Sequence, residues 1–185
     1  MKKKKFTTRD ITQIAIMAAF VFAATNIKID IPTPLGKTMV HMGNIICVLS
    51  GLLFGPVHGG LAAGIGSAIF DLTDPIFAPE FWITFIMKFA MGFMAGLISH
   101  MGKQSNVKNI VAAIIGAVSY VICYLTKNYI QEAILMKQPM ETVKAILLTK
   151  AATSFTNAMI AMVVSVILFN LLQPALKRAH LLQDK

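Results

Sequence analysis

The sequence has 185 residues, of which 56% are hydrophobic and only 14% are charged, with a formal net charge of +9. A soluble domain carries about a quarter charged residues, so this composition indicates an integral membrane protein with no room for a soluble catalytic domain. The positive charge does not indicate nucleic-acid binding. Five of the 17 lysines and arginines lie in residues 1–9, where a basic cluster flanking a membrane segment is expected.

Six apolar segments predict an all-α protein with six transmembrane helices, because lipid offers no partners for unpaired backbone groups. The segments cover residues 11–29, 39–55, 57–73, 81–101, 109–131 and 145–172. They form a single membrane domain over residues 1–185. Lysine and arginine are most frequent at both termini and between the fourth and fifth segments. This bias predicts cytoplasmic termini and a cytoplasmic basic segment at 1–9.

Several features that often accompany chemistry do not predict it here. The stretch IPTPLGKT ends like a phosphate-binding loop, but the position that needs the first glycine is Ile31. The four histidines and two cysteines lack ligand spacing, so we expect no metal site and no cofactor in this chain. No nucleophile has a recognisable base nearby in the sequence, and we therefore expect no enzyme activity.

Polar side chains recur at similar depth in several apolar segments, where ionisable groups are costly and often functional. We expect them to meet in a small pocket that opens outward. The candidate binding residues are Asn44, Trp82, Lys88, Tyr124, Lys127, Asn128, Lys150 and Asn157. Three of these are lysines, against one aspartate, Asp71, at comparable depth, and this balance favours an anionic ligand such as a carboxylate. The alternatives are that Lys127 and Lys150 extend to the outer headgroups, and that Lys88 pairs with Asp71.

Three alanines follow one another at four-residue spacing in the first segment, at positions 15, 19 and 23. Small residues at this spacing let another helix approach closely within a membrane. Ala15, Ala19 and Ala23 therefore predict either packing inside the chain or a docking face for a partner subunit. The loop TNIKIDIPTPLGKTMVH that follows could act as a lid over the pocket.

These motifs resemble the substrate-binding S-components of energy-coupling factor (ECF) vitamin transporters. The most specific matching stretches are HMGNIICVLSGLLFGPVHGGLAAGIGSAIFDLTDP and the following FWITFIMKFAMGFMAGLI. The chain looks like the branch that includes pantothenate-specific S-components, with hydroxymethylpyrimidine, pyridoxine and folate relatives near it.

The resemblance implies a multisubunit importer in which this chain captures a vitamin outside the cell, with pantothenate as the expected ligand. It implies that the alanine face contacts a transmembrane coupling subunit and that two cytoplasmic ATPases complete the complex. ATP and Mg would then bind only to those partners. A stand-alone channel or secondary carrier remains the alternative of another class.

Overall fold

The computed structural model of the chain describes residues 6–179, and residues 1–5 of the predicted basic cytoplasmic segment lie outside this range. In chain order the elements are α1 (Thr8–Thr25), β1 (Lys28–Thr33), β2 (Gly36–His41), α2 (Gly43–Phe54), α3 (Pro56–Thr73), η1 (Ala78–Glu80), α4 (Phe81–His100), α5 (Asn106–Tyr129), η2 (Ile130–Leu135) and α6 (Met140–Arg178). The six α-helices agree with the predicted helical class.

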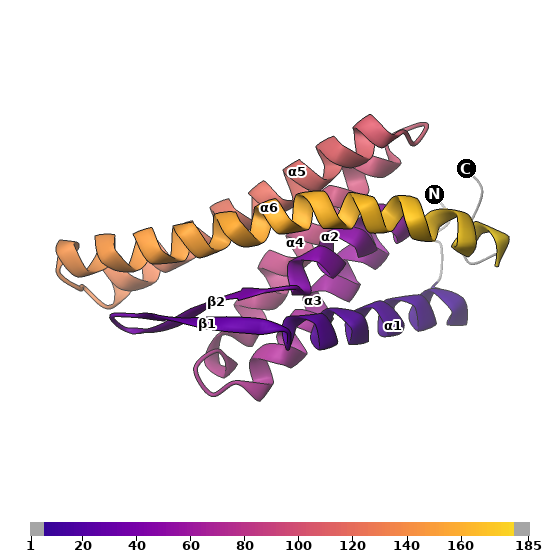
Figure 1. Cartoon of the computed structure of the whole chain (residues 1–185). Coiled ribbons are helices and arrows are strands. Elements are labelled where there is room, and N and C mark those ends of the chain that lie inside the picture. The colour runs from indigo at the N-terminus through magenta and orange to yellow at the C-terminus, as the bar shows by residue number, and fades with distance from the viewer. Residues whose placement is uncertain (1–5, 180–185) are drawn as a thin grey trace, which may run out of the picture.

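The helices form one bundle in which α3 packs against α1, α2 and α4, while α5 packs against α4 and α6. In Figure 1, the β1–β2 hairpin continues from the end of α1 and runs beside the first half of α6. The beginning of α1 and the end of α6 lie at the same end of the bundle (Figure 1). This arrangement places the hairpin beside the halves of the helices that carry the predicted polar residues.

Three helical stretches are long and apolar enough to cross a membrane: 78–100, 106–135 and 140–178. The helix α6 alone has 39 residues and a length of about 58 Å. The apolar α2 has 12 residues, and at about 18 Å it is shorter than a bilayer core. The prediction that all six helices span the membrane, with both termini in the cytoplasm, stays a prediction.

The region between the first two helices differs from the sequence prediction. The first and second segments were expected as helices over 11–29 and 39–55, but α1 ends at Thr25 and α2 begins at Gly43. The residues between them form an antiparallel hairpin in which Lys28 pairs with His41 and Thr33 pairs with Gly36.

The turn of this hairpin explains why the chain leaves the helical path. Pro34 has a fixed φ that suits the first corner of a turn, and it has no N–H to continue a helix. Gly36 follows with a φ of +114°, which a residue with a Cβ rarely adopts. The two residues reverse the chain, so the flanking segments pair with each other as strands.

Glycines bring the backbones of α2, α3 and α4 into direct contact. A Cβ added to Gly59 on α3 would lie 2.4 Å from the Cα of Gly51 on α2. A Cβ added to Gly92 on α4 would lie 2.6 Å from the carbonyl oxygen of Gly59. The hydroxyl of Ser50 also donates to this carbonyl at 3.0 Å. Close packing of this kind stabilises helix pairs in a membrane, where lipid supplies no hydrophobic driving force between them.

The backbone contact at Gly59 predicts that a substitution there destabilises the protein more than the same substitution at the neighbouring Gly60. Gly59→Ala places a methyl group against backbone that cannot move aside, so we expect a loss of about 1–3 kcal/mol and a lower midpoint of thermal unfolding. Gly60→Ala is the matched control, because its new methyl group would lie 3.0 Å from the ring and from the carbonyl oxygen of Phe89, a much smaller overlap than at Gly59. Equal midpoints for the two variants in the same detergent would contradict this account.

Candidate functional site

A cavity of about 70 Å³ lies between the hairpin and the helices α3, α4, α5 and α6. Its wall combines basic, acidic, hydroxyl and amide side chains with two tyrosine rings. The lining residues are Thr25, Lys37, Thr38, Met39, His41, Ser67, Phe70, Asp71, Phe77, Glu80, Thr84, Met87, Lys88, Tyr120, Tyr124, Lys127, Asn128, Lys150, Ser154 and Asn157. A cavity between the helices of a bundle with convergent polar side chains is a candidate binding site for a small molecule.

Lys88 on α4 is 3% exposed and provides an ammonium group at the cavity wall. Its Nζ donates a short hydrogen bond to Oδ1 of Asn44 on α2 and lies 3.7 Å from the ring centroid of Tyr120. The amide oxygen and the ring face both stabilise a cation without neutralising its charge. Among the ion pairs of the described residues, none joins Lys88 to Asp71, so the predicted alternative of a direct pair is not found.

Two further lysines line the cavity from α5 and α6. The Nζ of Lys150 donates to Oδ1 of Asn128 at 2.5 Å. The Nζ of Lys127 forms a short ion pair with the carboxylate of Glu80 on η1. Both lysines therefore contact partners inside the protein, and neither extends to lipid headgroups as the alternative prediction had it. Lys127 is neutralised by its carboxylate, which leaves Lys88 and Lys150 as the more available cations.

Residues of α5 and α6 hold the second strand of the hairpin over the cavity. Asn157 accepts a hydrogen bond from the backbone N–H of His41 at 2.9 Å, and its own amide donates to the backbone oxygen of Met39 at 2.9 Å. The hydroxyl of Thr38 lies 3.1 Å from that of Thr153 and 3.4 Å from that of Tyr124. Asn157 was predicted to bind ligand, and in the structure both ends of its amide bind the hairpin.

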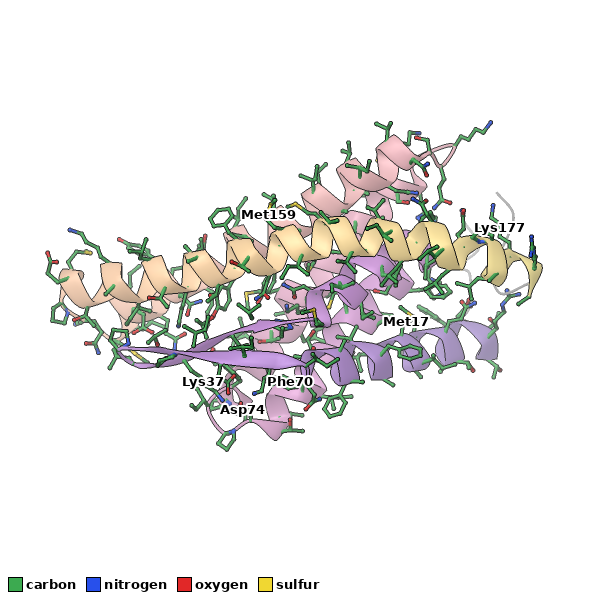
Figure 2. All side chains as sticks on the ribbon, in the orientation of Figure 1. Met17, Lys37, Phe70, Asp74, Met159 and Lys177 are labelled. Carbon is green, nitrogen blue, oxygen red and sulfur yellow. The ribbon has the colours of Figure 1, made fainter. Side chains whose placement is uncertain are left out.

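Asp74, in the connection after α3, ties the opposite side of the hairpin to the bundle. Its Oδ2 lies 2.7 Å from Nζ of Lys37 and 3.2 Å from Nζ of Lys28, one lysine from each strand. Figure 2 shows Lys37 and Asp74 near the hairpin, with Phe70 beside them. The Nζ of Lys28 lies 5.0 Å from the centroid of that ring. We call the contacts of Asp74 with the two lysines the hairpin latch.

The charges of the hairpin latch are reinforced by their own contacts. The hydrogen bond to Asp74 raises the pKa of Lys37 above its ordinary value, and the opposing effect of burial is smaller. For Asp74, burial favours the neutral acid, but hydrogen bonds from Lys37, the Ile76 amide and Lys28 together lower its pKa. Asp74 and Lys37 are therefore both charged at neutral pH, and acid weakens their contact progressively as the pH falls from the ordinary pKa of an aspartate through the lowered pKa of Asp74.

The cavity brings together six of the eight residues that the sequence predicted as binding residues, namely Lys88, Tyr124, Lys127, Asn128, Lys150 and Asn157. Asn44 does not line the cavity, and it acts on Lys88 from behind. Trp82 is 55% exposed and is not among the lining residues, so the sequence misplaced it. The reason is helical phase, because Trp82 lies about a third of a turn (about 120°) from the face of α4 that carries Lys88.

Sequence reasoning missed the contribution of the hairpin and of the short helix η1. The sequence assigned His41 no role, because the histidines lack ligand spacing, but His41 lines the cavity, and its Nδ1 accepts a hydrogen bond from the backbone N–H of Gly43 at 3.1 Å. Lys37 and Thr38 were placed in a loop, and Glu80 was not considered. The weak signal for this wall was the Pro34–Gly36 turn between two stretches rich in β-branched residues.

The three alanines of α1 form an exposed strip on the outer face of the bundle. Ala15, Ala19 and Ala23 are exposed, whereas Ala18 is 4% exposed and packs inward. A Cβ added to Gly66 on α3 would lie 2.3 Å from the carbonyl oxygen of Ala18. Packing inside this chain therefore uses the Ala18 face of α1, and the other three alanines remain uncovered.

Comparison with known proteins assigns the family. The family model described as "ECF-type riboflavin transporter, S component" matches residues 5–174. The chain belongs to this S-component family. A solved structure, "Structure and mechanism of the S component of a bacterial ECF transporter", is 20% identical, with a TM-score of 0.61 over 93% of this chain and 97% of that chain. At this identity the match shows a shared fold.

A relative from Pyrococcus woesei, "Uncharacterized protein in gap 3'region", is 40% identical over 48 residues. The match covers 26% of this chain and 32% of that protein, so the chain spans about a third of the length of this curated relative. The family assignment confirms the predicted ECF resemblance at the level of the S component. It describes a membrane transporter component and not an enzyme, and it leaves the pantothenate branch a prediction.

The hairpin latch of this S component predicts a local opening that depends on Asp74. Asp74→Asn removes the charge that both lysines share, so we expect faster amide hydrogen exchange in residues 28–41 by mass spectrometry. Asp30→Asn is the matched control, because Asp30 contacts the same two lysines but lies on the hairpin itself. After correction for the intrinsic rate, the wild-type exchange should stay constant between about pH 5 and 9, because neither Asp74 nor Lys37 titrates in this range. Equal exchange in the two variants would refute the latch.

Proposed function

We propose that this S component is the vitamin-binding subunit of an ATP-driven importer and that its ligand is pantothenate. The observation that carries the proposal is the pair of buried ammonium groups on Lys88 and Lys150. Each donates a hydrogen bond to an amide oxygen, of Asn44 and Asn128 respectively, and an amide oxygen does not neutralise the charge of the ammonium group. A carboxylate is the group that such ammonium groups bind best in a low-dielectric cavity.

The other residues that line the cavity favour a ligand that also carries hydroxyl and amide groups. Ser67, Thr84 and Ser154 line the cavity with hydroxyls, and Asp71 lines it with a carboxylate that accepts hydrogen bonds. Pantothenate combines one carboxylate with an amide and two hydroxyls. Polar groups left unpaired in a closed cavity are costly, so a ligand without these groups would bind less well.

Riboflavin is the second candidate, because the matching family model is described by that vitamin. The rings of Tyr120 and Tyr124 are stacked at 5.7 Å between centroids and line the cavity, which supports an aromatic ligand. Riboflavin is uncharged and would leave Lys88 and Lys150 without an anion. The neutral pyridoxine and hydroxymethylpyrimidine share this mismatch, whereas folate has carboxylates but is much larger.

The exposed alanine strip on α1 supports assembly with a transmembrane coupling subunit. Its three methyl groups form a smooth surface on which another helix can pack closely. Two ATPases on the cytoplasmic side would complete the complex in the prokaryotic plasma membrane and would bind the ATP and Mg. A stand-alone carrier needs none of these partners, and vitamin uptake by liposomes that contain this chain alone without ATP would favour that alternative.

Lys88→Met tests the proposed carboxylate site while preserving the length of the side chain. We expect pantothenate affinity to fall by about 10- to 100-fold, the loss expected for one charged hydrogen bond. Titration calorimetry of the purified protein measures this, with riboflavin titrated in parallel. Lys144→Met is the control, since Lys144 is 69% exposed on α6. Unchanged pantothenate affinity in Lys88→Met, or tight riboflavin binding by the wild type with none for pantothenate, would overturn the ligand assignment.

Ala19→Trp tests the proposed docking face. An indole in the middle of the alanine strip prevents close helix approach, so we expect vitamin affinity to be unchanged and co-purification with the coupling subunit to be lost. Met159→Trp on the exposed face of α6, labelled in Figure 2, is the control for an added indole elsewhere. If Ala19→Trp still co-purifies at the wild-type yield, this strip is not the docking face.

A further inference from the structure

Glu132 carries a buried carboxylate that the proposed function does not use. It lies on η2, the π-helical turn that continues α5, and it is 2% exposed. One carboxylate oxygen lies 3.9 Å from Nζ of Lys150. The other oxygen is buried without a hydrogen-bond partner among the described residues. A buried carboxylate with so few hydrogen bonds is costly, so its presence calls for a physical reason.

The position of Glu132 relative to the cavity gives that reason. Lys150 and Asn128 line the cavity, whereas Glu132 does not, so the carboxylate approaches the ammonium from behind the wall. The other charged groups close to Lys150 are Lys127 and Glu80, which form a short ion pair with each other. Glu132 is thus the carboxylate whose charge is available to Lys150 when the cavity is empty.

We propose that Glu132 is the internal counter-ion of Lys150 and sets how strongly the site prefers an anionic ligand over a neutral one. The carboxylate compensates the buried ammonium in the empty site, and the carboxylate of the ligand then shares the same ammonium from the cavity side. Two anions near one cation repel each other, so Glu132 limits the gain from binding a charged ligand. It is a positioning residue, because it acts on the ligand through Lys150.

The chain provides a matched control for this ion pair. Glu141 and Lys144 on α6 are also 3.9 Å apart, but their side chains are 93% and 69% exposed. An exposed pair of this kind is screened by water and contributes little. The same exchange of glutamate for glutamine can therefore be made in a buried pair and in an exposed pair of equal separation.

The first experiment rests on the proposed function and compares pantothenate with its uncharged alcohol analogue at pH 6.5. Calorimetry gives the ratio of the two affinities for each variant. Glu132→Gln should raise the preference for pantothenate by about tenfold, because the repulsion is lost. Lys150→Met should reduce the preference, and Glu141→Gln should leave it unchanged. A general packing defect would weaken the binding of both ligands and leave the ratio of their affinities unchanged. An unchanged ratio in Glu132→Gln therefore overturns the proposal.

A second experiment needs no vitamin and separates the two proposals if the wild type does not bind pantothenate. The neutral amine is the form that acetic anhydride acylates, and a neighbouring carboxylate favours the ammonium form. At pH 9, acetic anhydride should acetylate Lys150 several-fold faster in Glu132→Gln than in the wild type. The rate is measured by mass spectrometry relative to that of Lys144 in the same chain. Glu132→Asp should retain much of the wild-type rate. An unchanged Lys150 rate in Glu132→Gln refutes the counter-ion, whichever vitamin the S component binds.

Discussion

The cost of holding ammonium groups inside a helix bundle governs the organisation of this S component. Lys88, Lys127 and Lys150 each need a partner, because an isolated charge in a low-dielectric interior is strongly unfavourable. Their partners come from four other places in the chain: Asn44 on α2, Glu80 on η1, Asn128 on α5 and Glu132 on η2. Since no single helix can meet these requirements, the charged groups tie the elements together around the cavity.

The hairpin completes the site because it is held from two sides by different kinds of contact. On the α6 side, Asn157 binds the backbone of β2 through both ends of its amide. On the α3 side, Asp74 binds one lysine from each strand. The amide contacts are directional and buried, whereas the ionic contacts are partly exposed and are screened by salt. This asymmetry makes the Asp74 side the edge of the hairpin whose contacts depend on salt.

The two faces of α1 show how small residues serve different purposes in one helix. Ala18 packs against Gly66 within the chain, while Ala15, Ala19 and Ala23 remain uncovered on the other side. The glycines of α2, α3 and α4 serve the first purpose and bring these helices to backbone contact. The close packing of the glycines supports the interior that forms the cavity. The exposed alanine strip is the face that we propose docks on the coupling subunit.

The sequence by itself determined the helical class, the approximate course of the six helices and six residues of the polar wall. It did so because lipid-buried polar residues are rare enough to be informative one by one, and because helical spacing assigns them to faces. Only the tertiary structure decided the hairpin, the placement of Trp82 away from the cavity, and the partners of each lysine. Strand pairing and ion pairing depend on residues far apart in the chain, such as Lys37 with Asp74 or Lys88 with Asn44. Local periodicity contains no information about these distances, so the folded chain alone could supply them.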